Sequence, residues 1–102
     1  LISSFSLNAL KQVCALSHDQ VPVAVNLQRW PFCLPGIIKK QNCVSVHLDS
    51  NIVNAKRLAK LKSLGKKVAV FTVNEKEEAQ RLFSMGVDAV FSDDLSWIDL
   101  VE

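Results

Sequence analysis

The residues whose types could do chemistry are few and widely spaced in this sequence of 102 residues. His18 and His47 carry side chains that can act as an acid, a base or a ligand near neutral pH. The three cysteines are Cys14, Cys33 and Cys43. Their number is odd and no CxxC pair occurs, so neither a zinc site nor a disulfide framework is indicated. We expect the cysteines to be buried and reduced, in a cytoplasmic protein.

The composition is typical of a soluble globular domain. Apolar residues make up 49% of the chain and charged residues 22%, which excludes a disordered or low-complexity segment. The apolar stretches are interrupted by Pro, Asn or Gln, so we expect no membrane span. With only 3 glycines, the chain lacks a glycine-rich phosphate-binding loop.

Charge is divided unevenly along the chain. Residues 1–74 hold ten basic and two acidic residues, whereas residues 75–102 hold two basic and eight acidic ones. Six of the basic residues fall within Lys56–Lys67, which could form a nucleic-acid-binding face. They surround an apolar helical stripe and no aromatic residue lies among them, so a solvated helix face is the better interpretation. We expect no nucleic-acid partner.

Five short apolar runs predict the strands that position any site. They are Leu1–Phe5, Val21–Leu27, Cys43–Leu48, Lys67–Val73 and Ala89–Phe91. The three central runs are rich in β-branched residues and apolar on both faces, as is typical of parallel strands covered by helices. Their starts recur every 20 to 25 residues with helical patterns between them. The sequence therefore predicts repeated strand–helix units and an α/β fold.

Capping residues mark the expected helices. Ser6 is an N-cap for the first, and Ser50 or Asn51 begins another that Gly65 ends. Asn74 and Glu77 form a capping box for the next helix. That helix is expected to end at Gly86 and to bury Ala79, Leu82 and Phe83. A last short helix is expected to follow Asp94 or Ser96.

The segment Gln28–Asn42 departs from this pattern. Pro31 and Pro35 interrupt any helix there. We expect an irregular crossover packed outside the sheet, and a patch that contacts a partner or membrane surface is the alternative.

The first residue already belongs to a predicted strand, with no turn or cap before it. An open five-stranded sheet could fold alone, whereas part of a barrel would leave its inner face uncovered. We expect a fragment of a larger protein, whose N-terminal part or a second copy of the chain covers the open sheet.

Four motifs, in this order, resemble glycerophosphodiester phosphodiesterases, especially the short cytoplasmic bacterial type. They are Ser3–Leu10, Cys43–Leu48, Val70–Asn74 and Met85–Asp93. The resemblance runs from Leu1 to about Ile98. It implies that residues 1–102 are the C-terminal portion, the last five βα units, of a single (β/α)8 TIM-barrel domain whose N-terminal strands are missing.

The family hydrolyses glycerophosphodiesters to glycerol 3-phosphate and an alcohol, using a divalent metal (Mg or Ca) and two histidines. Its His-Arg-Gly and Glu-x-Asp motifs and its third metal-binding Glu have no counterpart here. The resemblance thus implies no catalytic residue, no metal bound by this chain, and no activity of this chain alone. Phe71 replaces a usual Trp, Ala89 a common Gly and Ser92 a usual Thr, changes that are mild for the fold. The change from Trp to Phe removes an N–H donor and some area, which affects the shape of the glycerol end of the pocket.

The expected substrate-binding residues are those near the strand ends, where the active sites of such barrels lie. They are Phe5, His47 and Phe71. His47 would face the barrel mouth if Cys43, Ser45 and His47 point inward. The alternatives are a structural histidine and core packing of the aromatic rings. Asn74 is interpreted as a helix cap, as is Asp93 for the final segment.

A stand-alone binding or signalling module with an open sheet, such as a receiver domain, is the alternative function. Asp49 and Thr72 match two of the required positions. Ser6 stands where a receiver needs acids, and Ser92-Asp93 stand where it needs Lys, so this alternative is the weaker one.

Overall fold

The structure is a computed structural model that describes residues 1–18, 20–31, 34–41, 43–94 and 96. Strands and helices alternate along the chain. The strands are β1 (Ile2–Ser4), β2 (Val23–Leu27), β3 (Ser45–Asp49), β4 (Lys67–Phe71) and β5 (Ala89–Val90). The helices are α1 (Leu7–Ser17), α2 (Leu34–Gln41), α3 (Ala55–Ser63) and α4 (Lys76–Met85). The predicted succession of strand–helix units is confirmed.

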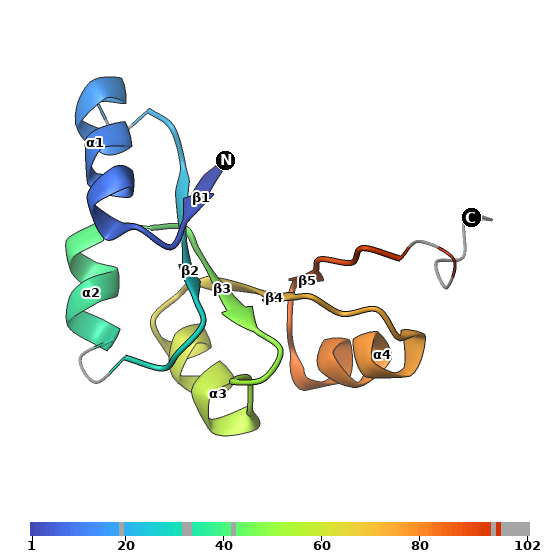
Figure 1. Ribbon diagram of the computed structural model, residues 1–102. Coiled ribbons are helices and arrows are strands. Elements are labelled where there is room, and N and C mark those ends of the chain that lie inside the picture. Colours follow the sequence, from blue (N-terminus) through green and yellow to red (C-terminus); the bar gives the residue numbers. More distant parts are fainter. Residues whose placement is uncertain (19, 32–33, 42, 95, 97–102) are drawn as a thin grey trace.

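The sheet is parallel throughout, and its strand order is the order of the chain, β1-β2-β3-β4-β5 (Figure 1). A receiver-like doubly wound sheet has the order 2-1-3-4-5, with helices on both faces. Figure 1 instead shows the four helices following one another around one side of the sheet. The receiver-like strand order, the example given for a signalling module, is therefore excluded.

The register divides the strand residues into two faces, because partners in a parallel sheet point to the same side. Val25, Val46 and Val68 are paired across β2, β3 and β4 and belong to the buried core. The helices add fully buried leucines to this face: Leu10, Leu58, Leu61 and Leu82. Each fully buried aliphatic side chain contributes about 1.5–3 kcal/mol, so the helix-covered face supplies most of the stabilisation.

The other face is concave. The rings of Phe5, after β1, and Phe71, on β4, are in edge contact, with 5.7 Å between their centroids. In a flat sheet these two strands would lie about 14 Å apart, at about 4.8 Å per neighbour. Side chains that stand perpendicular to the sheet meet across three strand spacings only if the sheet curves toward them. The five strands therefore form an arc of a barrel wall.

The segment predicted as irregular contains α2, so that prediction was wrong. Helix α2 begins at Leu34, which places Pro35 in its first turn. A proline is tolerated there because the first-turn amides have no intrahelical acceptor. Leu34 and Ile38 are buried in the core, so these two residues of α2 lie on a helix face that packs on the sheet.

Two helix starts also differ from the prediction. Helix α3 is capped by Asn54, whose Oδ1 accepts the Arg57 amide at 2.8 Å, and not by Ser50 or Asn51. Residues 50–52 instead form a turn in which the Asp49 side chain accepts the Asn51 amide. Helix α4 has Glu75 at its N-cap position without a side-chain cap, so the capping box at Asn74 does not form.

Of the other predictions for the helices, some are confirmed and some are wrong. Ser6 caps α1 by accepting the Ala9 amide, and Gly86 ends α4 in the left-handed region at φ 107°. Ala79 and Leu82 are buried as expected, but Phe83 is 48% exposed, so the prediction for Phe83 was wrong; it lies at the margin of the buried face of α4. The expected final helix lies mostly outside the described residues.

Cys43 is buried and Cys14 is half-buried, both as free thiols, whereas Cys33 lies outside the described residues. Burial raises the pKa of the Cys43 thiol, which keeps it in its unreactive protonated form. Of the described helices, none is both long and apolar enough to cross a bilayer.

Candidate active-site wall

The inner face of the sheet carries small and polar residues in rows that follow the register. Ala24 pairs with Ser45 in one row, and Asn26, His47 and Ala69 form the next. Small residues leave room in front of the sheet, whereas the valines of the opposite face fill the space beneath the helices. The inner face therefore carries small and polar side chains at the register positions beside the valines of the opposite face.

Phe5 and Phe71 meet at this carboxyl edge. Their rings are almost perpendicular, at 85°, the edge-to-face geometry that aromatic pairs favour. Phe5 is 53% exposed and Phe71 is partly buried. Two of the three expected substrate-binding residues are thus in direct contact and present an apolar rim.

His47 lies deeper on the inner face and is only 4% exposed. Its ring packs against Phe91, after β5, with 5.1 Å between the centroids. Burial lowers the pKa of the His47 imidazole, because a charged ring would lose its hydration. The ring is therefore neutral at pH 7, with one nitrogen that donates and one that accepts a hydrogen bond.

The inward row that was expected to include Cys43 begins at Ser45. Cys43 precedes β3 and is part of the buried core under the helices. Strand alternation does not extend to it, because β3 begins at Ser45 and the backbone before it follows another path.

Asn26 is a polar residue of this face that sequence reasoning missed. Its side chain donates to Ser3 Oγ at 3.5 Å, while its Oδ1 is buried and has no hydrogen-bond partner within the described part of the chain. A buried carbonyl oxygen without a donor is costly. The available signal was a single Asn in the otherwise apolar Val23–Leu27.

Asn74 ties two strand ends together. Its Oδ1 accepts hydrogen bonds from the Ser92 hydroxyl and from the Asp93 amide, both at 2.9 Å. It joins the loop after β4 to the segment after β5 and closes the edge beside Phe71 and Phe91. The Asp94 carboxylate accepts the Ser96 amide at 2.9 Å. The final segment that Asp93 was predicted to cap lies mostly outside the described residues.

No group of three His, Cys, Asp or Glu side chains among the described residues is arranged to hold a metal ion. His18, the second histidine, is exposed at the C-cap of α1. It precedes the start of β2 and does not follow the carboxyl end of a strand.

The curved parallel sheet, with helices on one side and an aromatic rim at its carboxyl edge, is one wall of a (β/α)8-type barrel. The family model of the glycerophosphoryl diester phosphodiesterase family matches residues 1–96. The chain belongs to this family. Comparison with curated proteins gives no significant match.

Solved structures share this fold. An Oleispira antarctica phosphodiesterase in complex with the product sn-glycerol-3-phosphate is 30% identical, with a TM-score of 0.84 over 89% of this chain. A glycerophosphodiester phosphodiesterase from Parabacteroides distasonis is 20% identical, with a TM-score of 0.72 over 89% of this chain. The matched part is 36% of the first structure and 37% of the second, so the chain corresponds to a partial barrel.

Proposed function

We propose that this chain is the C-terminal part of a glycerophosphodiester phosphodiesterase, a hydrolase that converts glycerophosphodiesters to glycerol 3-phosphate and an alcohol. The family match over residues 1–96 carries the proposal. The similarity to an enzyme whose structure holds sn-glycerol-3-phosphate supports the substrate class. In such an enzyme the chain supplies one wall of the pocket, and the N-terminal strands supply the rest.

In this proposal Phe5, His47 and Phe71 line the glycerol end of the substrate pocket. The aromatic rim of Phe5 and Phe71 contacts the glycerol carbons and excludes water from them. The neutral, buried His47 offers one donor and one acceptor to substrate hydroxyls without adding positive charge. These residues bind and orient the substrate and transfer no proton.

The family resemblance implies a divalent cation, magnesium or calcium, which would supply Lewis-acid chemistry at the phosphate. The described residues of this chain do not form a site that fits it. We therefore place its ligands and the acid–base groups on the N-terminal part of the barrel. The chain alone is expected to hydrolyse no substrate, and the N-terminal part or a second copy of the chain is expected to cover the inner face.

A complementation experiment tests this proposal. The chain is joined to the part of the Oleispira antarctica phosphodiesterase that it does not cover, and glycerol 3-phosphate release from glycerophosphocholine is measured with magnesium or calcium. The joined protein is expected to turn over and the chain alone is not. Turnover by the chain alone would contradict the assignment of the catalytic groups. An inactive joined protein with the circular dichroism of a folded barrel would contradict the function.

Variants of the joined protein test the pocket wall. Phe71→Ala is expected to raise KM more than it lowers kcat, because the ring binds the glycerol part and does not react. Phe71→Trp retains the apolar contact and is expected to keep KM close to the parent value. Phe83→Ala, which removes a half-exposed ring from α4, is the matched control. A fall in kcat at unchanged KM would contradict the binding role.

A cytoplasmic location and a role in lipid and glycerol metabolism follow from the same proposal, supported by the free thiols of Cys14 and Cys43. Fractionation of the source cells, with the protein expected in the soluble cytoplasmic fraction, tests the location.

A further inference from the structure

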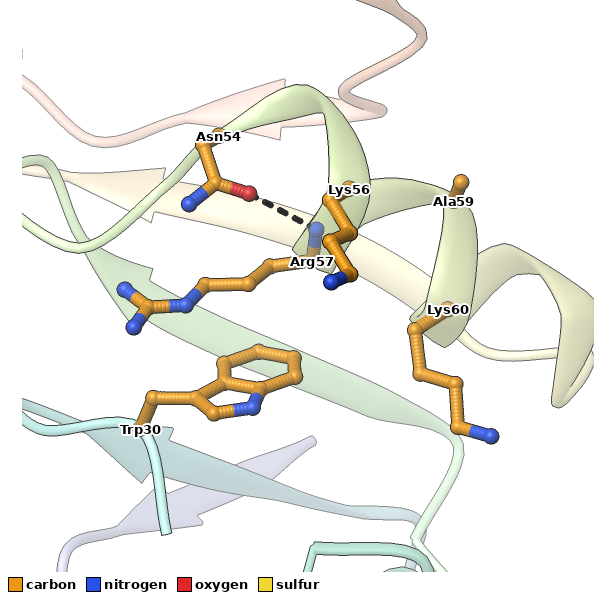
Figure 2. Close-up of a pocket in the computed structure, with 6 residues that line it drawn as sticks. All are labelled: Trp30, Asn54, Lys56, Arg57, Ala59 and Lys60. Atoms are coloured by element: carbon orange, nitrogen blue, oxygen red, sulfur yellow. Dashed lines mark hydrogen bonds between the residues drawn. The ribbon is translucent and has the colours of Figure 1, made fainter.

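A cavity lies on the helix side of the sheet. It has a volume of about 660 Å³ between the segment after β2 and helix α3. Its lining residues are Trp30, Asn54, Lys56, Arg57, Ala59 and Lys60 (Figure 2). None of them is a strand residue, and none belongs to the inner face of the sheet.

The lining is positively charged and contains no acidic residue. The ion pairs of the described residues are Lys62–Asp88 and Arg81–Glu78, so Lys56, Arg57 and Lys60 have no carboxylate partner there. The first turn of α3 has no acidic residue either, which leaves the positive end of the helix dipole uncompensated. The three cationic side chains and the N-terminus of α3 therefore all contribute positive potential to the same cavity.

The polar groups at the cavity are donors. Arg57 is fixed by its Nη1, which donates to the Ile52 carbonyl at 2.8 Å, and by the Trp30 ring, whose centroid lies 5.2 Å from the guanidinium carbon. The Trp30 indole N–H has no acceptor within the described residues, and its nitrogen lies on the side of Lys60 (Figure 2). Asn54 Oδ1, the one side-chain acceptor in the lining, is occupied by the Arg57 amide.

We propose that this cavity binds a phosphorylated small molecule, a phosphate monoester with an apolar or planar organic part. Hydrogen-bond donors and cationic side chains that point to one cavity, with no acidic side chain among them, favour the binding of an anion. The volume falls within the range of about 300–1,000 Å³ that small-molecule sites occupy and exceeds what a bare phosphate fills. The remaining space faces Trp30 and Ala59, which offer apolar contact to the organic part.

The positive charge of the site is expected to give phosphate monoesters a higher affinity than diesters. A monoester carries nearly two negative charges at pH 7 and a diester carries one, so three cations favour the monoester. Glycerophosphocholine also brings a quaternary ammonium, which the lysines repel. The site therefore prefers phosphate monoesters over glycerophosphocholine, and this preference does not depend on the proposed function.

Trp30 fluorescence tests the proposal. The variant Trp97→Phe leaves Trp30 as the one tryptophan of the chain and is titrated with inorganic phosphate, glycerol 3-phosphate, phenyl phosphate and glycerophosphocholine. We expect saturable changes in fluorescence, with phenyl phosphate binding most tightly and glycerophosphocholine most weakly. Equal affinity for glycerophosphocholine and glycerol 3-phosphate would overturn the monoester assignment.

Charge variants in the same background locate the site. The double variant Lys56→Gln, Lys60→Gln is expected to weaken phenyl phosphate binding by about tenfold or more, equivalent to about 1.4 kcal/mol. Lys56→Arg, Lys60→Arg keeps the charge and is expected to retain binding. Lys11→Gln, Lys76→Gln removes the same charge from exposed positions of α1 and α4 and is expected to change nothing.

Two results would overturn the proposal. Equal weakening by both glutamine pairs would show attraction to net charge without a site. Displacement of phenyl phosphate by a single-stranded oligonucleotide, in a way that also requires Lys66 and Lys67, would show an extended nucleic-acid face. Circular dichroism of each variant verifies folding, and the binding readout stays independent of any hydrolysis assay.

Discussion

The two faces of the sheet differ in their amino-acid composition and in how much of each is exposed. The helix-covered face is built of branched aliphatic residues such as Val46, Leu48 and Val70, all fully buried. The concave face is built of serine, alanine, asparagine and histidine, and its aromatic rim is half exposed at Phe5 and Phe91. Stabilisation therefore comes mainly from one face, and the other is free to carry polar groups at the strand ends.

This division predicts the largest loss of stability on the covered face. Leu48→Ala is expected to lower the free energy of unfolding by about 2–5 kcal/mol, because the side chain is fully buried and its removal leaves a cavity. Phe83→Ala removes a larger but 48% exposed side chain from α4 and is the control, with a smaller loss. Urea unfolding followed by circular dichroism measures both. Equal losses would contradict the division between the faces.

A smaller loss is expected where the chain enters β5. Asp88 accepts hydrogen bonds from Lys62 and from the Val68 amide, and the Lys62 bond is the main reason that its pKa is lowered. Asp88→Asn is expected to cost about 1–3 kcal/mol at pH 7, whereas Asp93→Asn costs little. The stabilisation is present above the ordinary pKa near 4 and is lost as the pH falls below it. A pH-independent cost would contradict this account.

His47 makes the free energy of unfolding depend on pH through a basic side chain, whereas Asp88 does so through an acidic one. Because burial lowers its pKa, the unfolded chain binds a proton first as the pH falls below about 6.5, and the free energy of unfolding decreases. His47→Gln is expected to remove this decrease between pH 7 and 5. His18→Asn changes the exposed histidine and should preserve it. A decrease that persists in His47→Gln would assign it to another group.

The smallest expected effect concerns the curvature of the sheet. A double-mutant cycle with Phe5→Leu and Phe71→Leu should give a coupling of about 0.5–1.5 kcal/mol for the edge-to-face pair. The pair Phe5→Leu and Phe83→Leu should be additive, because these residues lie on opposite sides of the sheet. Zero coupling between Phe5 and Phe71 would indicate a flatter sheet.

Sequence reasoning located the strands because branched apolar residues mark buried parallel strands at a regular interval. It missed α2 because it treated Pro35 as a helix breaker, although the first turn accepts proline. It placed the start of α3 too early because Ser50, Asn51 and Asn54 are all good caps, and only the path of the turn after Asp49 selects Asn54.

The candidate site was predicted in part. The aromatic residues at strand ends were found from the family resemblance, and the structure places Phe5 against Phe71. The role of Asn74 was wrong because its bonding partner, the segment after β5, is 18 residues away and is not visible in a local capping pattern. Asn26 was missed because one polar residue in a strand does not reveal which face it occupies.

The consecutive strand order has a consequence for how the chain is made. Val25 pairs with Val46, and Val46 with Val68, so partners are 21 and 22 residues apart along the chain. During synthesis each strand leaves the ribosome when its neighbour already exists, and the loop to be closed has almost the same length at every step. Assembly can therefore proceed from one end to the other without waiting for distant segments.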